Sequence, residues 1–223
     1  MVAKKIQTRD PDATRLRILQ AAKIEFARKG LGGARVDDIA ARAKTNKRML
    51  YHYFGNKDDL FRITLEHAYA DFREAEANME LQRDDPITAM RRLVTFTWNY
   101  YLANPEFITL INSENLHKAK HLKVSKRTPE LSRPFVQRMQ DLLTRGTAQN
   151  LFRPNLDAMQ VNFTIAAIGY YYLTNRYTGA LVYERDLMTT EALVARLDFN
   201  IQTILRMVCT LATLQNLDRK GET

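Results

Sequence analysis

Apolar residues recur every three or four positions along most of the chain, which is the spacing of one face of an α-helix. Between about residues 14 and 29, Ile18, Ala22 and Phe26 lie four positions apart, and Gly30 follows as a stop signal. Alternating patterns typical of β-strands do not recur, and Asn-Gly or Asp-Gly hairpin turns do not occur. The pattern therefore predicts an all-α protein.

Cap residues mark several further helix starts. Asn46 precedes a short helix from Lys47 to about Tyr53, and Asn56 precedes a longer one. Asp85-Pro86 and Asn104-Pro105 each place a cap residue before a proline at the first helical position. The remaining segments are a polar loop with two prolines at 118–134 and helices at about 135–150, 156–182 and 190–217, which makes about nine helices in all.

The last two predicted helices have broad apolar faces. In the final helix the apolar stripe consists of Leu193, Leu197, Ile201, Ile204, Val208 and Leu211. Two such helices are too apolar to face water, so we expect them to pair with a twofold mate in a four-helix interface. The alternative is an ordinary core within one chain, which accounts for about half of the stripe.

Charge is distributed unevenly along the 223 residues. Residues 1–60 hold 14 Lys/Arg against 7 Asp/Glu, a net charge of +7, whereas the other 163 residues hold 20 against 18, a net of +2. A basic quarter joined to a near-neutral remainder indicates a region that binds a polyanion. The single cysteine, Cys209, excludes a disulfide framework, and the longest apolar stretch, residues 165–173, is too short to span a bilayer. The N-terminus has no secretory signal, so we expect a cytoplasmic protein.

The basic region contains a predicted helix-turn-helix. A short helix at 35–43 is followed by the connection 44–46 and the helix that begins at Lys47. Leu50 and Phe54, four positions apart, can anchor that helix to its neighbours. The side chains that then point away from this core are Lys47, Arg48, Met49, Tyr51 and His52. Such cationic, phenolic and apolar groups suit the phosphates and base edges of the DNA major groove, although a solvated basic helix is the alternative interpretation.

Residues 14–61, and especially "ILQAA…FARKG", "VDDIAARA" and "LYHYFGNKDDL", resemble the DNA-binding module of the tetracycline-repressor (TetR) family of transcriptional regulators. The resemblance implies a three-helix DNA-binding domain at 1–56 and a helical ligand-sensing and dimerisation domain at 57–223. By resemblance, Lys47, Arg48, Met49 and Tyr51 meet DNA. Tyr53 holds a position often occupied by His, and Lys57 falls where a lysine binds phosphate.

The sequence departs from the family pattern at several positions. Lys44-Thr45 replaces the usual Gly-Val of the turn, Arg48 replaces a frequent Gly, and Arg35 stands where a hydroxyl residue is usual. The predicted DNA-binding residues are Arg35, Thr45, Lys47, Arg48, Met49, Tyr51, His52, Tyr53 and Lys57. Lys4, Lys5 and Arg9 form a basic arm that either reaches phosphates or a minor groove, or is a solubilising tail.

Candidate ligand-binding residues lie in the second predicted domain. Aromatic and polar side chains that can line a pocket there are Trp98, Tyr101, Asn112, Asn115, His117, Phe163, Tyr170 and Asn175. For each of them, packing in the core is the competing interpretation. His117 and His121 have helical metal-ligand spacing but no clear third ligand, so we predict neither a metal site nor a cofactor.

The leading hypothesis is a homodimeric, ligand-responsive regulator, most simply a repressor that a small organic effector releases from a palindromic operator in double-stranded DNA. A non-specific architectural DNA-binding protein needs the same charge but no pocket. An enzyme is not expected, because the sequence has no phosphate-cradling glycine loop and no nucleophile motif.

Overall fold

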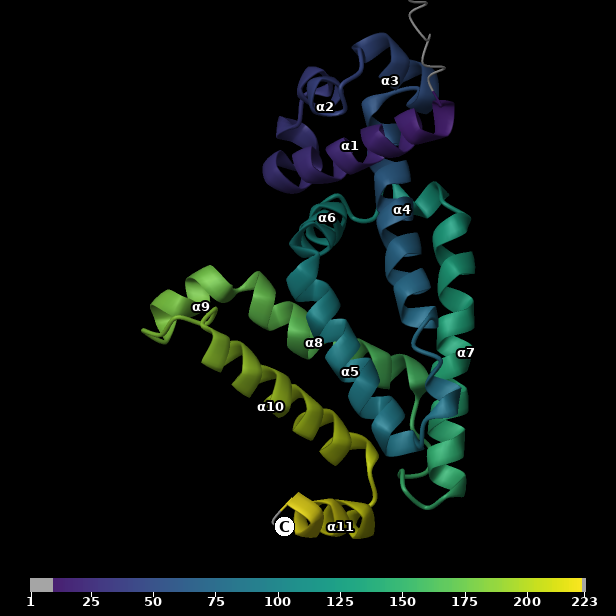
Figure 1. The fold of residues 1–223 in the computed structure, drawn as a ribbon, viewed down its shortest axis with the longest axis vertical. Coiled ribbons are helices and arrows are strands. Elements are labelled where there is room, and N and C mark those ends of the chain that lie inside the picture. Colours follow the sequence, from purple (N-terminus) through teal and green to yellow (C-terminus); the bar gives the residue numbers. More distant parts are fainter. Residues whose placement is uncertain (1–9, 222–223) are drawn as a thin grey trace, which may run out of the picture. The chain divides into compact units, whose positions relative to one another are not determined.

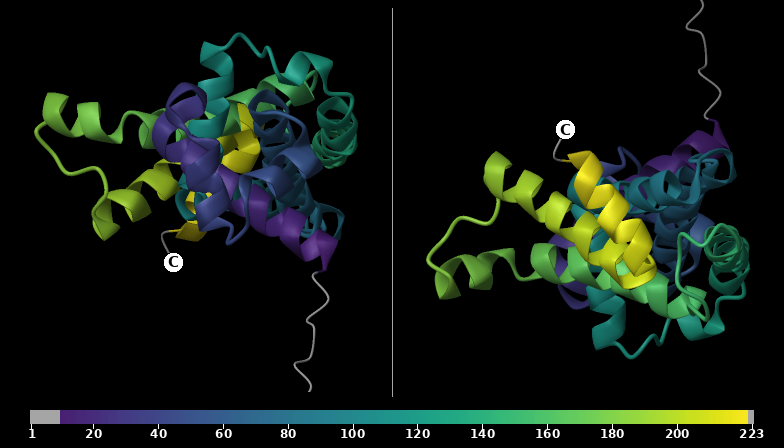
Figure 2. Two further views of the ribbon diagram at one scale, coloured as in Figure 1. Left: turned by 90° about the horizontal axis from the view of Figure 1, so that it is seen from above. Right: turned by 90° about the horizontal axis from the view of Figure 1, so that it is seen from below.

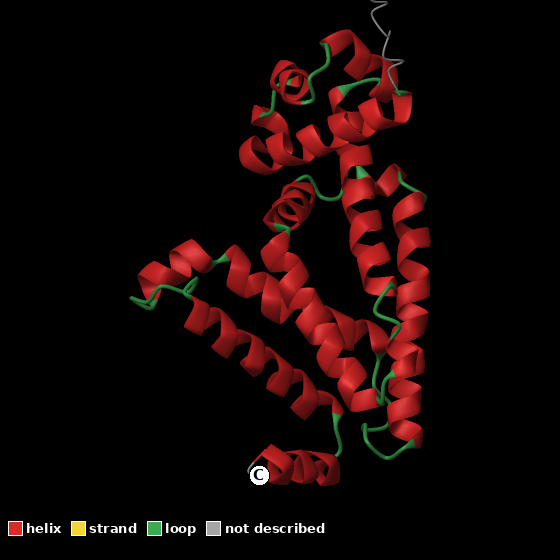
Figure 3. Cartoon of the chain, viewed as in Figure 1, coloured by secondary structure: helices red, strands yellow, loops and turns green. Residues whose placement is uncertain are grey.

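The computed structural model describes residues 10–221, and every regular element within this range is a helix (Figure 3). The predicted all-α fold is therefore confirmed. The α-helices are α1 (Pro11–Gly33), α2 (Val36–Arg42), α3 (Lys47–Phe54), α4 (Lys57–Ala77), α5 (Pro86–Ala103), α6 (Pro105–Leu116), α7 (Arg127–Ala148), α8 (Ala158–Thr174), α9 (Arg176–Val182), α10 (Thr190–Val208) and α11 (Leu211–Gly221). Two short 3₁₀ turns, η1 (Leu81–Arg83) and η2 (Leu122–Val124), connect longer helices.

The predicted caps begin helices in the structure. Asn46 Oδ1 accepts a hydrogen bond from the Met49 amide at 2.9 Å, and Asn56 Oδ1 accepts one from the Asp59 amide at 2.9 Å. Asp85 Oδ1 likewise accepts from the amides of Ile87 and Thr88. These bonds satisfy amide groups that have no acceptor within the helix, which explains why short polar residues start these helices.

Helix boundaries differ from the prediction at three places. Helix α7 begins at Arg127, within the predicted loop 118–134, because Pro129 lies in the first turn, where no backbone donor is needed. The predicted helix at 156–182 breaks at Asn175, whose ψ of 13° is not helical. The predicted helix at 190–217 breaks at Cys209, which forms an isolated antiparallel bridge with Phe152. The described chain therefore has eleven α-helices rather than about nine.

The chain forms two compact units. The described part of the first unit, residues 10–70 and 109–128, contains α1, α2, α3, most of α4, most of α6 and η2. Its core includes Ile18, Phe26, Ile39, Leu50 and Phe61, each with an exposed fraction of 0%. The rings of Phe26 and Phe61 meet edge to face with centroids 5.1 Å apart. Each such side chain contributes roughly 1.5–3 kcal/mol by leaving water, so this core fixes the short helices.

The second unit, residues 71–108 and 129–221 of the described chain, packs α5 against α8 and α10, and α7 also contributes to its core. Ile204 and Val208 of the predicted apolar stripe lie in this core with 0% exposure. For these two positions the alternative interpretation, an ordinary core within one chain, is therefore correct. Within the unit, α8 and α10 run outward to α9, which lies at the far end of the pair (Figures 1 and 2). No helix of the described chain is long and apolar enough to cross a membrane.

Candidate nucleic-acid interface

Helix α3 has one buried face and one exposed face. Leu50 is 0% exposed and Phe54 is 4% exposed, so these two residues hold the helix against the core of the first unit. The other face exposes Lys47, Arg48, Tyr51 and His52. The two anchors were inferred from their spacing of four residues, and the burial of both is the feature that leaves the basic face free.

The exposed face of α3 contains two cations, Lys47 and Arg48, and Lys47 forms a weak ion pair with α2. Lys47 Nζ lies 3.2 Å from Asp37 Oδ2 of α2, and both side chains are largely exposed. An exposed pair of this kind contributes about 0–1 kcal/mol, so an incoming phosphate can replace the carboxylate. Arg48 is exposed on the same face. The Met49 side chain is half-buried, as is Tyr53, whose ring packs edge-on against His52 with centroids 5.4 Å apart.

The turn between α2 and α3 has the geometry of a glycine turn without a glycine. Lys44 has a φ of 51°, in the left-handed region that glycine enters most easily. Thr45 follows it, is half-buried, and its amide donates to the Ala40 carbonyl at 3.0 Å. The replacement of the usual Gly-Val by Lys44-Thr45 thus leaves the turn intact and places a lysine at its exposed corner.

A buried carboxylate joins α1 to α2. Glu25 is 2% exposed, and its oxygens contact Arg42 Nη2 at 2.7 Å and Lys29 Nζ at 3.0 Å. The hydrogen bonds from Arg42, and then those from Lys29, lower the pKa of Glu25, so this carboxylate stays ionised. Lys29 also contacts Asp38 of α2 at 2.8 Å. This network could not be predicted from the sequence, because Glu25 resembles the other polar residues of α1.

Two predicted DNA-binding residues flank α3 at the ends of neighbouring helices. Arg35 is exposed at the start of α2 and makes no capping bond with its side chain. Lys57 begins α4, and its Nζ donates to the Gly32 carbonyl at 3.4 Å. Both cations therefore belong to the same compact unit as the exposed face of α3. Lys4, Lys5 and Arg9 of the predicted basic arm lie outside the described residues.

The predicted ligand-binding residues belong to both units. Trp98 and Tyr101 are 2% and 6% exposed and pack in the core of the second unit, whereas Phe163 is 62% exposed. Tyr170 of the second unit is half-buried, and burial raises the pKa of its hydroxyl. Among the polar candidates, Asn175 belongs to the second unit, and Asn112, Asn115 and His117 belong to the first. Their ligand-binding role stays a prediction.

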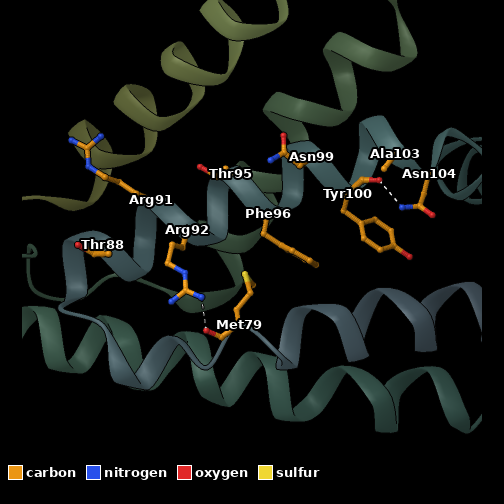
Figure 4. A pocket seen from close by; sticks show the side chains of 10 residues that line it. All are labelled: Met79, Thr88, Arg91, Arg92, Thr95, Phe96, Asn99, Tyr100, Ala103 and Asn104. Carbon is orange, nitrogen blue, oxygen red and sulfur yellow. Dashed lines mark hydrogen bonds between the residues drawn. The ribbon is translucent and has the colours of Figure 1, made fainter.

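One cavity of the second unit lies beside α5 and has a volume of about 470 Å³ (Figure 4). Phe96 and Tyr100 contribute aromatic surface to it, and Met79 lies opposite them. Burial, together with the nearby carboxylate of Asp71, raises the pKa of Tyr100 to about 12, so its hydroxyl remains a neutral donor. Arg92 is held by the Met79 carbonyl at 2.9 Å and pairs with Asp84. These residues were not predicted as a group from the sequence.

A second cavity, of about 570 Å³, lies where α8, α9 and α10 meet. It is lined by Asn175, one of the predicted ligand-binding residues, and by Tyr172 and Arg196. The Arg196 guanidinium lies 5.1 Å from the centroid of the Tyr172 ring and donates to the Ile168 carbonyl at 2.9 Å. Both cavities fall within the size range of small-molecule sites.

Comparisons with known proteins agree with this geometry. The profile described as "Bacterial regulatory proteins, tetR family" matches residues 18–62, and that described as "Tetracyclin repressor-like, C-terminal domain" matches residues 86–204. The HTH-type transcriptional repressor NicS of Pseudomonas putida is 38% identical over 201 residues, which cover 90% of this chain and 95% of that protein. The repressor SCO4008 of Streptomyces coelicolor is 41% identical over 108 residues, covering 48% of this chain and 53% of that protein.

Solved structures show the same architecture. The proposed transcriptional regulator SCO4942 from Streptomyces coelicolor superposes with a TM-score of 0.66 and 26% identity, covering 87% of this chain and 98% of that one. The hemolysin II transcriptional regulator HlyIIR superposes with a TM-score of 0.55 and 21% identity, covering 90% of this chain and 99% of that one, a likeness of fold alone. Both family profiles and the NicS relative lead to one conclusion: the chain belongs to the tetR family of bacterial regulatory proteins and is a DNA-binding transcriptional regulator.

Proposed function

We propose that the chain is a homodimeric repressor that binds a palindromic operator and leaves it when a small organic effector binds. The observation that carries this proposal is the division of α3 into a buried face, Leu50 and Phe54, and an exposed cationic face. The relatives NicS and SCO4008 are named as repressors, which favours repression over activation.

Helix α3 is the proposed reading element. A major groove about 12 Å wide admits one helix, and its guanine edges accept hydrogen bonds from Arg or Lys. Arg48 and Lys47 are the proposed donors to bases or phosphates, Met49 contacts a thymine methyl group, and the Tyr51 hydroxyl donates to a phosphate. Arg35, Thr45, His52, Tyr53 and Lys57 complete the proposed contacts, mainly to the backbone.

Two recognition helices are needed for a palindrome, because half-sites lie about 34–36 Å apart. We propose that α8 and α10 form the twofold interface. Large apolar side chains support this: Phe163 of α8 is 62% exposed, and Val194 and Phe199 of α10 are 65% and 60% exposed. These positions lie on α8 and α10 but outside the stripe that the sequence analysis named in the final helix. A Phe163→Glu/Phe199→Glu variant should sediment as a monomer at concentrations where the parent protein sediments as a dimer.

The effector site is proposed in the second unit. The cavity beside α5 combines aromatic and thioether surface with the polar groups of Arg91 and Asn99, which suits a small, flat organic molecule. Helix α4 contributes residues 57–70 to the first unit and 71–77 to the second, so it is the proposed route between effector and DNA. A coupling free energy of about 1–3 kcal/mol changes operator affinity by roughly 5- to 150-fold.

The test is a binding assay on DNA selected from a random library by the full-length protein. We expect a palindromic consensus, and the Lys47→Ala/Arg48→Ala variant should bind that duplex at least 100-fold more weakly. The control variant, Lys23→Ala/Arg28→Ala, removes the same charge from α1 and should retain the preference for the palindrome. Circular dichroism must show that both variants keep the helical content of the parent protein.

Two results would contradict the proposal. Recovery of no consensus, with salt-dependent binding to every duplex, would instead favour a non-specific architectural protein. An α3 variant that keeps the parent affinity for the selected palindrome would remove α3 from the interface.

A further inference from the structure

The segment 117–127 is the most basic part of the first unit outside the helix-turn-helix. Its sequence, HKAKHLKVSKR, contains Lys118, Lys120, Lys123, Lys126 and Arg127, and no Asp or Glu occurs between Glu114 and Glu130. The described residues of the first unit hold 17 Lys/Arg against 9 Asp/Glu, whereas those of the second hold 14 against 15. The excess positive charge of the described chain is thus confined to the unit that contains α3.

A buried carboxylate fixes the start of this segment. Glu114 is 3% exposed, and its Oε1 accepts hydrogen bonds from the amides of His121 and Leu122 at 2.8 and 2.9 Å. Its Oε2 lies 2.6 Å from His121 Nδ1. The His121 ring is buried as well and packs edge-on against Phe61 of α4, with centroids 5.0 Å apart. The His121 ring therefore anchors the segment to α4.

The anchored segment meets α4 at its first turn. Lys120 Nζ donates to Asp58 Oδ2 at 3.0 Å, and His121 Nε2 lies 3.8 Å from the same oxygen. Asp58 follows Lys57, the proposed phosphate contact at the start of α4. Lys120 and His121 of the segment consequently lie beside the first turn of α4, where the proposed DNA backbone passes.

The remaining lysines of the segment are not neutralised by the protein. Lys118, Lys123 and Lys126 are exposed and make no ion pair with any described carboxylate. Three uncompensated ammonium groups in one anchored segment repel one another. The segment 117–127 therefore favours an anionic partner.

We infer that the segment 117–127 is a second DNA-binding surface, which holds the sugar-phosphate backbone beside the half-site read by α3. The inference rests on the proposed function, since the duplex must first be placed by α3 and Lys57. Lysines meet phosphates as point charges and carry no base preference, so this surface adds affinity without adding specificity. A solvated basic loop, the competing interpretation, would leave DNA binding unchanged when its charges are removed.

The test compares two variants with equal charge changes. The first, Lys118→Gln/Lys123→Gln/Lys126→Gln, leaves Lys120 in place, because it pairs with Asp58. The control, Arg83→Gln/Arg206→Gln/Arg219→Gln, removes three exposed cations from the second unit. Fluorescence anisotropy would measure the affinity of each for the selected palindrome within a long duplex, for the palindrome without flanks, and for a scrambled duplex, at several salt concentrations.

For the segment variant we expect affinity for both long duplexes to fall by roughly tenfold, with an unchanged ratio between them. The slope of log affinity against log salt should become shallower by about 2 for each phosphate contact that one segment makes, since each lost contact changes it by about 0.9 and a dimer has two segments. The loss should shrink on the palindrome without flanks. A segment variant that matches the control in affinity and slope, while the parent protein still prefers the palindrome, overturns this inference alone. A parent protein without that preference instead refutes the proposed function.

Discussion

The Glu114 carboxylate provides a sharp test of how the first unit is held together. It is buried and accepts two backbone hydrogen bonds and one from the His121 ring. Glu114→Ala removes all three acceptor contacts and leaves the His121 amide and ring N–H buried without partners. Each unsatisfied buried donor costs about 1–3 kcal/mol, so we expect a loss of roughly 3–5 kcal/mol in the free energy of unfolding.

The Glu114→Gln substitution removes the negative charge of the side chain and keeps its shape. The glutamine carbonyl can still accept from the amides of His121 and Leu122, whose donor–acceptor distances are 2.8 and 2.9 Å. Its amino group, however, must donate to His121 Nδ1, which moves the ring proton to Nε2, 3.8 Å from Asp58. We therefore expect a smaller loss, about 1–2 kcal/mol, from the change of one hydrogen bond.

Urea unfolding followed by circular dichroism gives the free energies, and hydrogen exchange gives a local measure. In Glu114→Ala the amides of His121 and Leu122 should exchange roughly 100- to 4,000-fold faster, since each 1.4 kcal/mol is a factor of ten. Glu130→Ala, at an exposed position of α7, is the matched control and should change little. A Glu114→Ala protein within 1 kcal/mol of the parent, or equal losses for the two Glu114 variants, would refute the reasoning.

Three further predictions concern packing and ionisation. Leu50→Ala, at a fully buried anchor of α3, should lower the free energy of unfolding of the first unit by about 2–5 kcal/mol in urea titrations. Gly146→Ala should lose about 1–3 kcal/mol by calorimetry, because the new Cβ overlaps the Phe152 ring, whereas Gly169→Ala, with its nearest contact at 3.5 Å, should be tolerated; equal effects would contradict this. Burial raises the pKa of the Cys209 thiol from 9.0 to about 11. As pH rises above 9 the unfolded chain loses this proton first, so stability should decline between pH 9 and 11, and native protein at pH 8 should react with a thiol reagent roughly 100-fold more slowly than unfolded protein.

Helix α3 could be predicted from the sequence because its determinants are local. Asn46 caps it, Leu50 and Phe54 are one turn apart, and Lys47 and Arg48 before them are too polar for a core. The same reasoning located the starts of α4 and α5. There the side-chain oxygens of Asn56 and Asp85 accept hydrogen bonds from amides of the first helical turn. The apolar period also predicted the all-α fold.

The anchoring of the segment 117–127 could not be predicted in this way. Glu114 and His121 are seven residues apart and meet only because Lys118 and Ala119 adopt left-handed φ values of 55° and 57°. Neither residue type indicates such a conformation, so no sequence signal marks the turn. His121 therefore read as a possible metal ligand paired with His117, whereas its ring is bonded to a carboxylate that the sequence analysis did not single out.

The cavities were missed for a related reason. Aromatic residues that are conspicuous in the sequence, such as Trp98, are buried in the core. The residues around the α5 cavity come from one face of that helix and from Met79, which precedes the helix in the sequence. Composition gives the number of aromatic side chains but not which of them remain accessible. The break at Cys209 likewise coincides with a tertiary contact, the bridge to Phe152.

Helix α9 has no buried side chain among its seven residues, and Leu181 and Val182 are 80% and 73% exposed. A two-turn helix is unstable alone, because too few hydrogen bonds offset the entropy of its ordering. Under the proposed pairing through α8 and α10, a partner chain would also protect α9, which connects them, so a dilute sample should be cut in α9 by a protease well before a concentrated one. The rate of that cleavage, measured against protein concentration, would report on the proposed dimer without DNA or an attached label.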